Sequence, residues 1–269
     1  MTSREVISSG SAAGAWIEAA RSILDHIADS QMEPIRRVSS WCADTIAAGG
    51  LVHLFGSGHS RIPLEEMFPR YGSFPGFHPM AELSMTFHTE VVGTNGQRQA
   101  MFIERVEGLA EVILSNYEFG EDDIMMVFSS SGRSAVPIEM AQGAHRRGLK
   151  VVDVTSVAES MASEPSHPTG TRLLDHADQV IDIGTPAGDA LVRLDGMETP
   201  VGPGSTVANA AVVNEIKVQV AETLVARGIV PPVLTSGSVI GAEESERLFE
   251  QAYAEHSHRL ARVLDKGGT

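Results

Sequence analysis

Two short polar loops carry the residue types in this chain that could do chemistry. The first, GSGHS, runs from Gly56 to Ser60 and follows the apolar stretch LVHLF. The second, SSSGRS, runs from Ser129 to Ser134 and follows the apolar stretch IMMVF. Hydroxyls, backbone N–H groups and a helix N-terminus converge at the second loop, which suits a phosphate that carries no nucleoside. The alternative is an ordinary serine-capped helix start.

Nucleotide binding is not supported by either loop. A dinucleotide fingerprint needs a third glycine, and Arg61 stands at that position. A Walker A loop needs Gly-Lys-Ser/Thr, which is absent. A third polar cluster, GPGSTVAN, opens the longest helical pattern. Its Ser205 and Thr206 could add hydroxyl donors to the same pocket, or Ser205 could be only the N-cap of that helix.

Proton transfer next to a sugar carbonyl needs a base and an acid. Glu65 and Glu66 are the acidic candidates beside the first loop. Because helix neighbours lie about 100° apart, we expect only one of them to face a common pocket, and we favour Glu66. His59 could act as the acid, or could bond to neighbouring backbone. Arg70 is a candidate anion clamp, or else a salt-bridge partner at the surface.

The surrounding pattern is strand, short loop, helix, strand, which predicts a parallel sheet covered by helices. Ligands of such sheets bind at the carboxyl ends of the strands, where both loops lie. The Gly- and Pro-rich segment 184–204 is either a mobile active-site loop or an irregular connection. The expected helices span 11–30, 34–48, 60–70, 98–115, 135–147, 205–227 and 242–264, and the expected strands span 51–55, 124–128, 150–156 and 179–183.

Composition limits the class of partner. The net charge of -15 argues against nucleic acid, which requires a basic face. There is no secretory signal and no apolar run of the ~18 residues that a membrane span needs, so we expect a cytoplasmic protein. The lone Cys42 is expected to be a packed thiol. Ten histidines show no metal-binding spacing, so no metal and no cofactor are expected, and His53 is expected to be a satisfied core residue.

With these residues in view, the chain resembles the SIS (sugar isomerase) domain family from about residue 13 to 260, in its phosphoheptose-isomerase-like branch. The matching stretches are GSGHS with Glu65, Glu66 and Arg70 after it, then ERVEGLAEVIL, VFSSSGRSAVPIEMA and HPTGTRLLDHAD. The resemblance implies a three-layer αβα sandwich with a five-stranded parallel sheet and extra N-terminal helices. It also implies phosphosugar-binding residues in the two loops: Gly56, Ser57, Gly58, Ser60, Ser129, Ser130, Ser131, Gly132 and Ser134.

Family members include aldose–ketose isomerases and non-catalytic regulators that sense a sugar phosphate. We expect a phosphosugar isomerase that works through an enediolate with a glutamate base. The alternative is a sugar-phosphate-binding regulator, and a third option is elimination from an amino-sugar ether. Residues 1–40 give one amphipathic helix and no basic recognition element, so we do not expect a regulator with a DNA-binding helix-turn-helix.

Two positions depart from the pattern of phosphoheptose isomerases. Their catalytic glutamate, about ten positions after the loop serine, would fall on Arg70. Their late catalytic histidine falls in a helix that here offers Asn214, Glu215 and Lys217. Glu215 is therefore another candidate base, or a structural partner of Lys217. His88 resembles a position of the same branch that could reach a neighbouring subunit's site, or it is simply packed.

The resemblance also suggests how the chain is divided. Residues 1–48 are expected to form a helical extension that packs on the domain or on a partner subunit, and residues 49–269 to form the SIS phosphosugar-binding domain. These N-terminal helices suit subunit contacts, so we expect a homodimer or a homotetramer.

Overall fold

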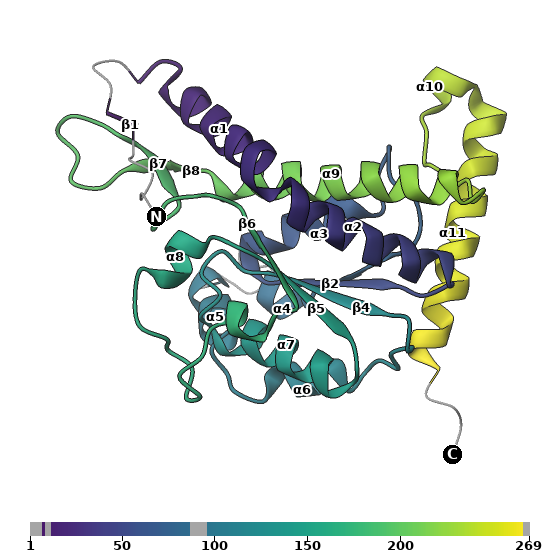
Figure 1. The fold of residues 1–269 in the computed structure, drawn as a ribbon, viewed down its shortest axis with the longest axis horizontal. Coiled ribbons are helices and arrows are strands. Elements are labelled where there is room, and N and C mark those ends of the chain that lie inside the picture. Colours follow the sequence, from purple (N-terminus) through teal and green to yellow (C-terminus); the bar gives the residue numbers. More distant parts are fainter. Residues whose placement is uncertain (1–6, 9–11, 87–95, 266–269) are drawn as a thin grey trace.

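A five-stranded, fully parallel sheet forms the centre of the molecule in the computed structural model, which describes residues 7–8, 12–86 and 96–265 (Figure 1). The strand order is β3-β2-β4-β5-β6, so the chain enters this sheet at β2, adds β3 at one edge, and then extends through β4 and β5 to β6 at the other edge. The strands are β2 (Val52–Gly56), β3 (Phe77–Met80), β4 (Ile124–Phe128), β5 (Lys150–Thr155) and β6 (Gln179–Asp182).

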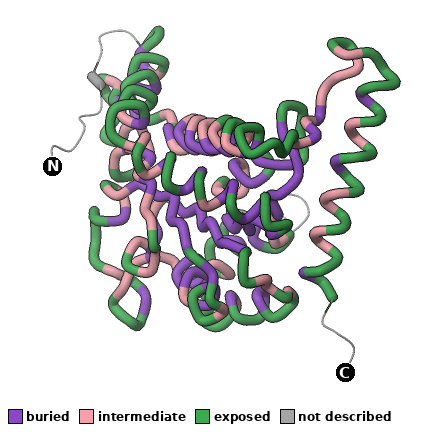
Figure 2. Tube along the Cα trace, turned by 45° about the vertical axis from the view of Figure 1, so that its right-hand side comes forward, coloured by how far each residue is buried: buried purple, intermediate pink, exposed green. Residues whose placement is uncertain are grey.

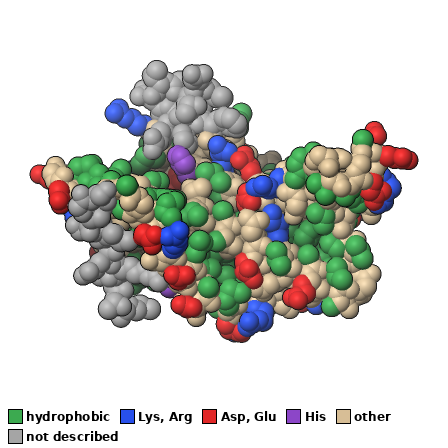
Figure 3. All heavy atoms as spheres, turned by 90° about the horizontal axis from the view of Figure 1, so that it is seen from above, with side chains coloured by type: hydrophobic (Ala, Val, Ile, Leu, Met, Phe, Trp, Pro, Cys, Tyr) green, Lys and Arg blue, Asp and Glu red, His purple; other side chains and the backbone are tan. Residues whose placement is uncertain are grey.

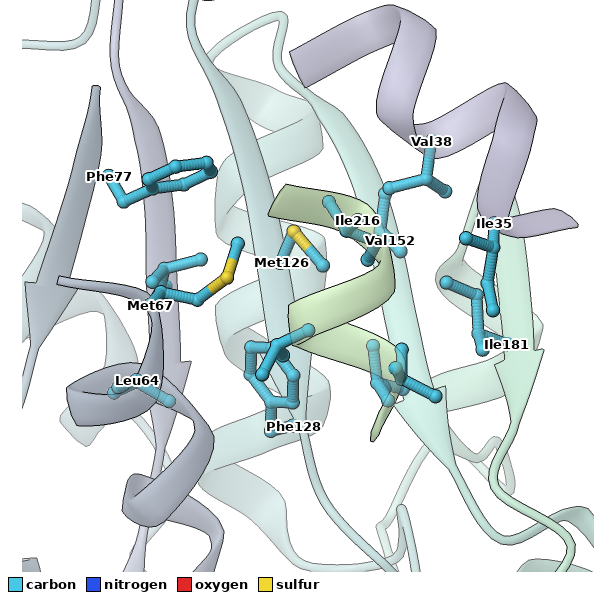
Figure 4. Packing of buried hydrophobic residues seen from close by; sticks show 14 of the residues in the cluster. Ile35, Val38, Leu64, Met67, Phe77, Met126, Phe128, Val152, Ile181 and Ile216 are labelled. Carbon is cyan, nitrogen blue, oxygen red and sulfur yellow. The ribbon is translucent and has the colours of Figure 1, made fainter. Parts of the chain in front are cut away.

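Helices cover both faces of this sheet because successive strand residues point to opposite sides. Leu54 and Met126 belong to the hydrophobic cluster of one face, and Phe55 and Met125 to that of the other. Figure 4 shows the first cluster, where side chains from helices and strands interdigitate. The first face is covered by α2 (Met32–Ala47), α3 (Ile62–Met67) and α9 (Ser205–Ala226), and the second by α6 (Leu109–Leu114) and α7 (Ala135–Arg146). The predicted three-layer sandwich is confirmed.

The two N-terminal helices are joined without a break. A π-helical turn at 27–31 connects α1 (Ala15–His26) to α2, so the two separate helices expected from the sequence form one continuous helical run. Ile35 and Cys42 of α2 lie in the same hydrophobic cluster as the sheet. Cys42 is fully buried, and burial raises the pKa of its thiol, which confirms the expectation of a packed thiol.

The structure differs from the sequence-based expectation at one helix and one strand. The helix expected at 98–115 is two helices, α5 (Gly96–Ile103) and α6, because Gly108 adopts a φ of 82° and breaks the helix before Leu109. The sequence pattern also missed β3, an edge strand that contains a proline.

The segment 184–204 is not irregular throughout, because it forms a short hairpin. It contains β7 (Ala190–Arg193) and β8 (Val201–Pro203), which pair antiparallel, and β1 (Ile7–Ser8) pairs parallel with β7. Figure 1 shows this small sheet beside α1 and the start of α9. Several of its glycines adopt positive φ values, and residue 189, just before β7, reaches the site described below.

The C-terminal helix lies at the side of the sandwich. After α10 (Gly237–Ile240), α11 (Ala242–Leu264) is mostly exposed and is attached to the rest by a few contacts (Figure 2). The Arg259 guanidinium donates to the carbonyls of Ile46 and Gly50, and Arg262 donates to Asp123 at 2.8 Å. The remaining short helices are α4 (Leu83–Thr86) and α8 (Val157–Met161). Among the described residues, no helix combines the length and the hydrophobicity required to cross a membrane.

Candidate functional site

The three polar clusters of the sequence meet at one cavity of about 310 Å³. It lies beyond the carboxyl ends of β2 and β4, where a parallel sheet leaves its loops free to bind a ligand. Ser205 and Thr206 share this cavity with both loops, which was one of the two possibilities for the third cluster. The lining residues are His59, Ser60, Ser130, Asp189, Pro203, Ser205, Thr206 and Asn209.

The first loop turns tightly at Gly56. A Cβ at this position would lie 2.2 Å from the carbonyl oxygen of Ser60, so only glycine fits. The turn brings Ser60 and the exposed side chain of His59 to the cavity. Ser57 turns away: its buried hydroxyl donates a 2.5 Å hydrogen bond to the carboxylate of Glu104.

The serine loop is held together by its own residues. The Ser129 hydroxyl accepts from the N–H of Gly132 at 3.2 Å, and Thr155 donates to the Ser129 carbonyl at 2.6 Å. Gly132 has a φ of 57°, which an L side chain rarely adopts. Ser130 faces the cavity, whereas Ser134 is the N-cap residue of α7 and lines a different cavity. Ser131 is partly buried and lines neither of these two cavities.

Asp189 caps the helix that opens at the third cluster. Its carboxylate accepts from the N–H groups of Gly204 and Ser205 at 3.1 and 2.8 Å and from the Ser205 hydroxyl at 2.5 Å. Gly204 therefore occupies the N-cap position, and the prediction of Ser205 as N-cap was wrong. Asp189 adopts a φ of 49°, a conformation that aspartate tolerates better than most residues. A carboxylate at this helix start disfavours an anion there, so this end of the cavity suits sugar hydroxyls.

Asn209 also lines the cavity, and the sequence analysis did not identify it. Its side chain is 4% exposed, and its amide oxygen has no hydrogen-bond partner among the described residues. It lies one turn into α9, after Ser205, so helical spacing from the third polar cluster was the signal that could have found it.

Glu65, Glu66 and Arg70 lie elsewhere, in a groove of about 570 Å³ between α3 and α11. Both glutamates line this groove, although we expected only one of them to face a common pocket. None of the residues that line the first cavity lines this groove, so the structure does not bring these three residues together with the loops. The reason is local: the 3-10 turn at 58–61 faces the cavity, and the following helix α3 turns its acidic residues toward α9 and α11.

Both of these glutamates form ion pairs with arginines. Glu65 receives two 2.9 Å hydrogen bonds from Arg61. The Glu66 carboxylate pairs with Arg70 and accepts from the Asn214 amide at 2.9 Å. Partial burial alone would raise the pKa of Glu66, but the hydrogen bonds from Asn214 and Arg70 outweigh it and hold the pKa below its usual value.

Glu215 and His88 are the remaining candidate catalytic residues. Glu215 accepts a 2.8 Å hydrogen bond from Gln219 on its own helix. Lys217 is buried and donates to the Glu66 carbonyl, so Glu215 and Lys217 do not form the suggested pair. His88 lies outside the described residues.

Glu104 is the carboxylate that sequence reasoning missed. Its side chain accepts from Ser57 of the first loop, and its backbone carbonyl accepts from the N–H of Val136 in the first turn of α7. Glu104 therefore contacts both the first loop and the start of α7, the helix that follows the serine loop. The only sequence signal was its place in ERVEGLAEVIL, which resembles the family. In the described part of the chain, no three His, Cys, Asp or Glu side chains are grouped so as to hold a metal ion.

Comparison with known proteins identifies the family. The model of the SIS domain matches residues 15–156. The chain belongs to the SIS domain family. A UPF0309 protein of Streptomyces avermitilis is 36% identical over 231 residues, which are 85% of this chain and 90% of that protein. A UPF0309 protein of Listeria monocytogenes is 32% identical over 240 residues, which are 89% of this chain and 95% of that protein.

A solved phosphoheptose isomerase from Francisella tularensis is also similar to this SIS-domain chain. It shares 14% identity, covers 78% of this chain and 96% of its own, and superposes with a TM-score of 0.48. The SIS-domain match and the two relatives above confirm the family resemblance read from the sequence.

Proposed function

We propose that this SIS-domain protein binds a phosphorylated or otherwise anionic sugar and interconverts its aldose and ketose forms. The observation that carries the proposal is the convergence of three polar loops on one cavity, with hydroxyls from Ser60, Ser130 and Thr206 around it. Hydroxyl and amide groups at the carboxyl edge of a parallel sheet are the donors and acceptors that a sugar needs.

The reaction requires a proton to leave the carbon next to the carbonyl. A carboxylate takes this proton, and the two electrons of the C–H bond form the enediolate. An acid protonates the carbonyl oxygen, a proton leaves the neighbouring hydroxyl, and the carboxyl group returns its proton to the other carbon. His59 lines the cavity, and because an imidazole ring can both donate and accept a proton, it is our choice for the transfer between the oxygens.

The base is better assigned to Glu104 than to Glu66. A base works best with a pKa near the working pH, and the partners of Glu66 move its pKa in the wrong direction. Neither carboxylate lines the cavity, and Glu66 lines the groove beside α11. Glu104 contacts the first loop directly through Ser57. Glu65, Glu66 and Glu215 are accordingly proposed as structural carboxylates.

Proton NMR in D₂O tests the proposal directly. The purified protein is incubated with pentose, hexose, heptose and N-acetylamino-sugar phosphates, one at a time. Loss of the proton signal next to the carbonyl, with or without a new ketose, would support proton abstraction and identify the substrate class. If no sugar exchanges its proton while one of them raises the melting temperature, the enzymatic proposal fails.

A regulator that binds a sugar phosphate without turnover is the second candidate function. One observation favours it: the two glutamates next to the first loop, which were the expected bases, are both engaged by arginines outside the cavity. The regulator would bind its ligand through the same loops and show no exchange in D₂O.

A further inference from the structure

Two buried histidines and a buried aspartate form a hydrogen-bond relay beside the C-terminal end of α11. His53 and His78 are register partners in β2 and β3, and Asp123 immediately precedes β4. The three residues are 0%, 6% and 2% exposed, respectively. They lie at the edge of the sheet where the strands begin, opposite to the first cavity. Nothing in the function proposed above uses this relay.

The direction of the relay follows from the charge of Asp123. Burial would raise the pKa of this carboxyl, but the hydrogen bonds from His53 and Arg262 outweigh it and hold the pKa below its usual value. The ionised carboxylate only accepts hydrogen bonds, so His53 donates to it from Nε2 at 3.1 Å. The bare Nδ1 of His53 then accepts from the Nδ1–H of His78, 2.8 Å away. This arrangement leaves the Nε2 of His78 without a proton.

The same aspartate attaches α11 to the body of the molecule. Its Oδ1 atom accepts a 2.8 Å hydrogen bond from the guanidinium of Arg262, whose side chain is 42% exposed. The neighbouring carbonyl of Val263 accepts from the N–H of Glu118 at 2.7 Å. Because α11 is mostly exposed and has few other attachments, the carboxylate at the end of the relay is well placed to control how firmly this helix is held (Figure 2).

Positive groups on α11 oppose a charge on the relay. Burial lowers the pKa of both histidines, so both are neutral near pH 7. Arg262 further disfavours a charge on His53, and His256 disfavours one on His78. Both of these groups belong to α11, so a proton added to the relay repels this helix. The titratable or charged groups that face the two histidines are Asp123 before β4, Arg262 and His256 of α11, and Tyr117 after α6.

We propose that Asp123, His53 and His78 form a proton-operated latch that holds the C-terminal part of α11 at neutral pH and releases it in acid. A proton binds the Nε2 of His78, the Nδ1 proton of His78 passes to His53, and the Nε2 proton of His53 passes to Asp123. One proton is taken up and none is released, and the carboxyl loses the charge that holds Arg262. Two aromatic side chains of α11 line the groove beside α3, so release of the helix opens that groove.

The pH range of the latch follows from proton uptake. In the released state the histidines titrate near pH 6.5, whereas in the closed state burial and neighbouring charge lower the pKa of His78 to about 3. Below about pH 6.5 the released state therefore binds protons that the closed state does not, and the closed state is lost as the pH falls. Each proton taken up changes the ratio of closed to released helix by about tenfold per pH unit.

Hydrogen exchange of the full-length protein, followed by mass spectrometry, tests the latch. Protection of α11, corrected for the intrinsic exchange rate, should fall about tenfold or more from pH 6 to pH 5, while that of α9 stays constant. His78→Asn keeps a donor for His53 and removes one titrating group, so the fall should be about threefold smaller or less. Arg262→Gln should lower α11 protection about threefold at pH 7. His258→Asn, at an exposed histidine of α11, is the matched control and should behave like the unaltered protein.

Three results would overturn the proposal: constant protection of α11 between pH 6 and pH 5, equal loss of protection in α9 and α11, or an unchanged fall in His78→Asn. If His78→Asn fails to fold, long-range ¹H–¹⁵N NMR of the unaltered protein at pH 7 tests the relay instead. The proton should reside on Nε2 of His53 and on Nδ1 of His78, and any other pair of tautomers contradicts the relay. No sugar enters these measurements, so their outcome is independent of the function proposed above.

Discussion

Ser57 and Glu104 are joined by a 2.5 Å hydrogen bond, although 47 positions separate them in the chain. The bond attaches the loop that follows β2 to the end of α5, and it holds a carboxylate against the first loop at Ser57. No other glutamate described above touches either polar loop in this way.

Replacing Glu104 by glutamine should abolish proton exchange into the sugar while sugar binding persists. The amide still accepts the Ser57 hydrogen bond, but it cannot take a proton from carbon. We expect exchange in D₂O to fall by at least a thousandfold, on the order of what removal of a general base costs. Glu66→Gln is the matched control and should retain most of the exchange. The reverse pattern, with exchange lost only in Glu66→Gln, would return the assignment to α3.

Gly56→Ala should destabilise the protein and remove sugar binding. The new Cβ meets the Ser60 carbonyl, which is backbone and has no rotamer to change, so the first loop must shift. Overpacking of this kind costs about 1–3 kcal/mol in the free energy of unfolding. Gly148→Ala serves as control, because its Cβ would meet open space and only its φ of 82° is unfavourable. Urea unfolding and sugar titration of both variants provide the comparison; a Gly56→Ala protein that still binds sugar normally would contradict the close approach.

Asp189→Ala should lower the free energy of unfolding by about 1–2 kcal/mol, the usual effect of removing a helix cap. The variant leaves the N–H groups of Gly204 and Ser205 without their acceptor. Asp189→Asn keeps an acceptor oxygen and tolerates the left-handed backbone, so most of the stability should return. Urea unfolding at pH 7 measures both, and equal losses in the two variants would argue against a capping role.

Stability should fall as the pH drops from 7 to 5 because two buried histidines are neutral in the folded protein. The Nδ1 atoms of His53 and His78 are 2.8 Å apart, and His53 also contacts Asp123, which confirms His53 as a satisfied core residue. Burial lowers the pKa of both, and the neighbouring His53 helps to lower that of His78 to about 3.

The sign of this dependence follows from proton uptake. Below the unfolded pKa, near 6.5, the unfolded chain binds protons that the folded chain does not, so folding stability is lost as the pH falls. Each buried histidine can contribute up to about 1.4 kcal/mol per pH unit below that value. His78→Asn should flatten the curve of urea midpoints between pH 5 and 8. An unchanged slope in this variant would show that other groups cause the dependence.

The N-terminal helices are proposed to make subunit contacts in a homodimer or a homotetramer. Ile17 and Leu24 of α1 are 49% and 39% exposed, which is high for large apolar side chains on one helix. Hydrophobic side chains are also visible among charged ones on the face drawn in Figure 3. Light scattering should give a mass of two or four chains, and Ile17→Glu with Leu24→Glu should shift it toward one. A monomeric unaltered protein would contradict the proposal and the separate role of residues 1–48.

The sequence alone determined the layers of this fold and the loops that carry its polar groups. Local hydrophobic patterns predict buried strands such as IMMVF and the amphipathic helices. A parallel sheet then places the loops after β2 and β4 at the same edge. The positions of Ser60 and Ser130 in one cavity follow from that rule. Local patterns also predicted the end of α9 near Gly228.

Only the tertiary structure decided which charged groups share a site. Glu66 follows the first loop closely in sequence, yet a short helix turns it toward Asn214 and the groove beside α11. Glu104 and Asp189 reach the loops across 47 and 15–16 positions, through packing of α5 and of a hairpin that carried no clear pattern. Side-chain partners across such separations depend on how whole elements pack, and this information does not reside in the spacing of neighbouring residues.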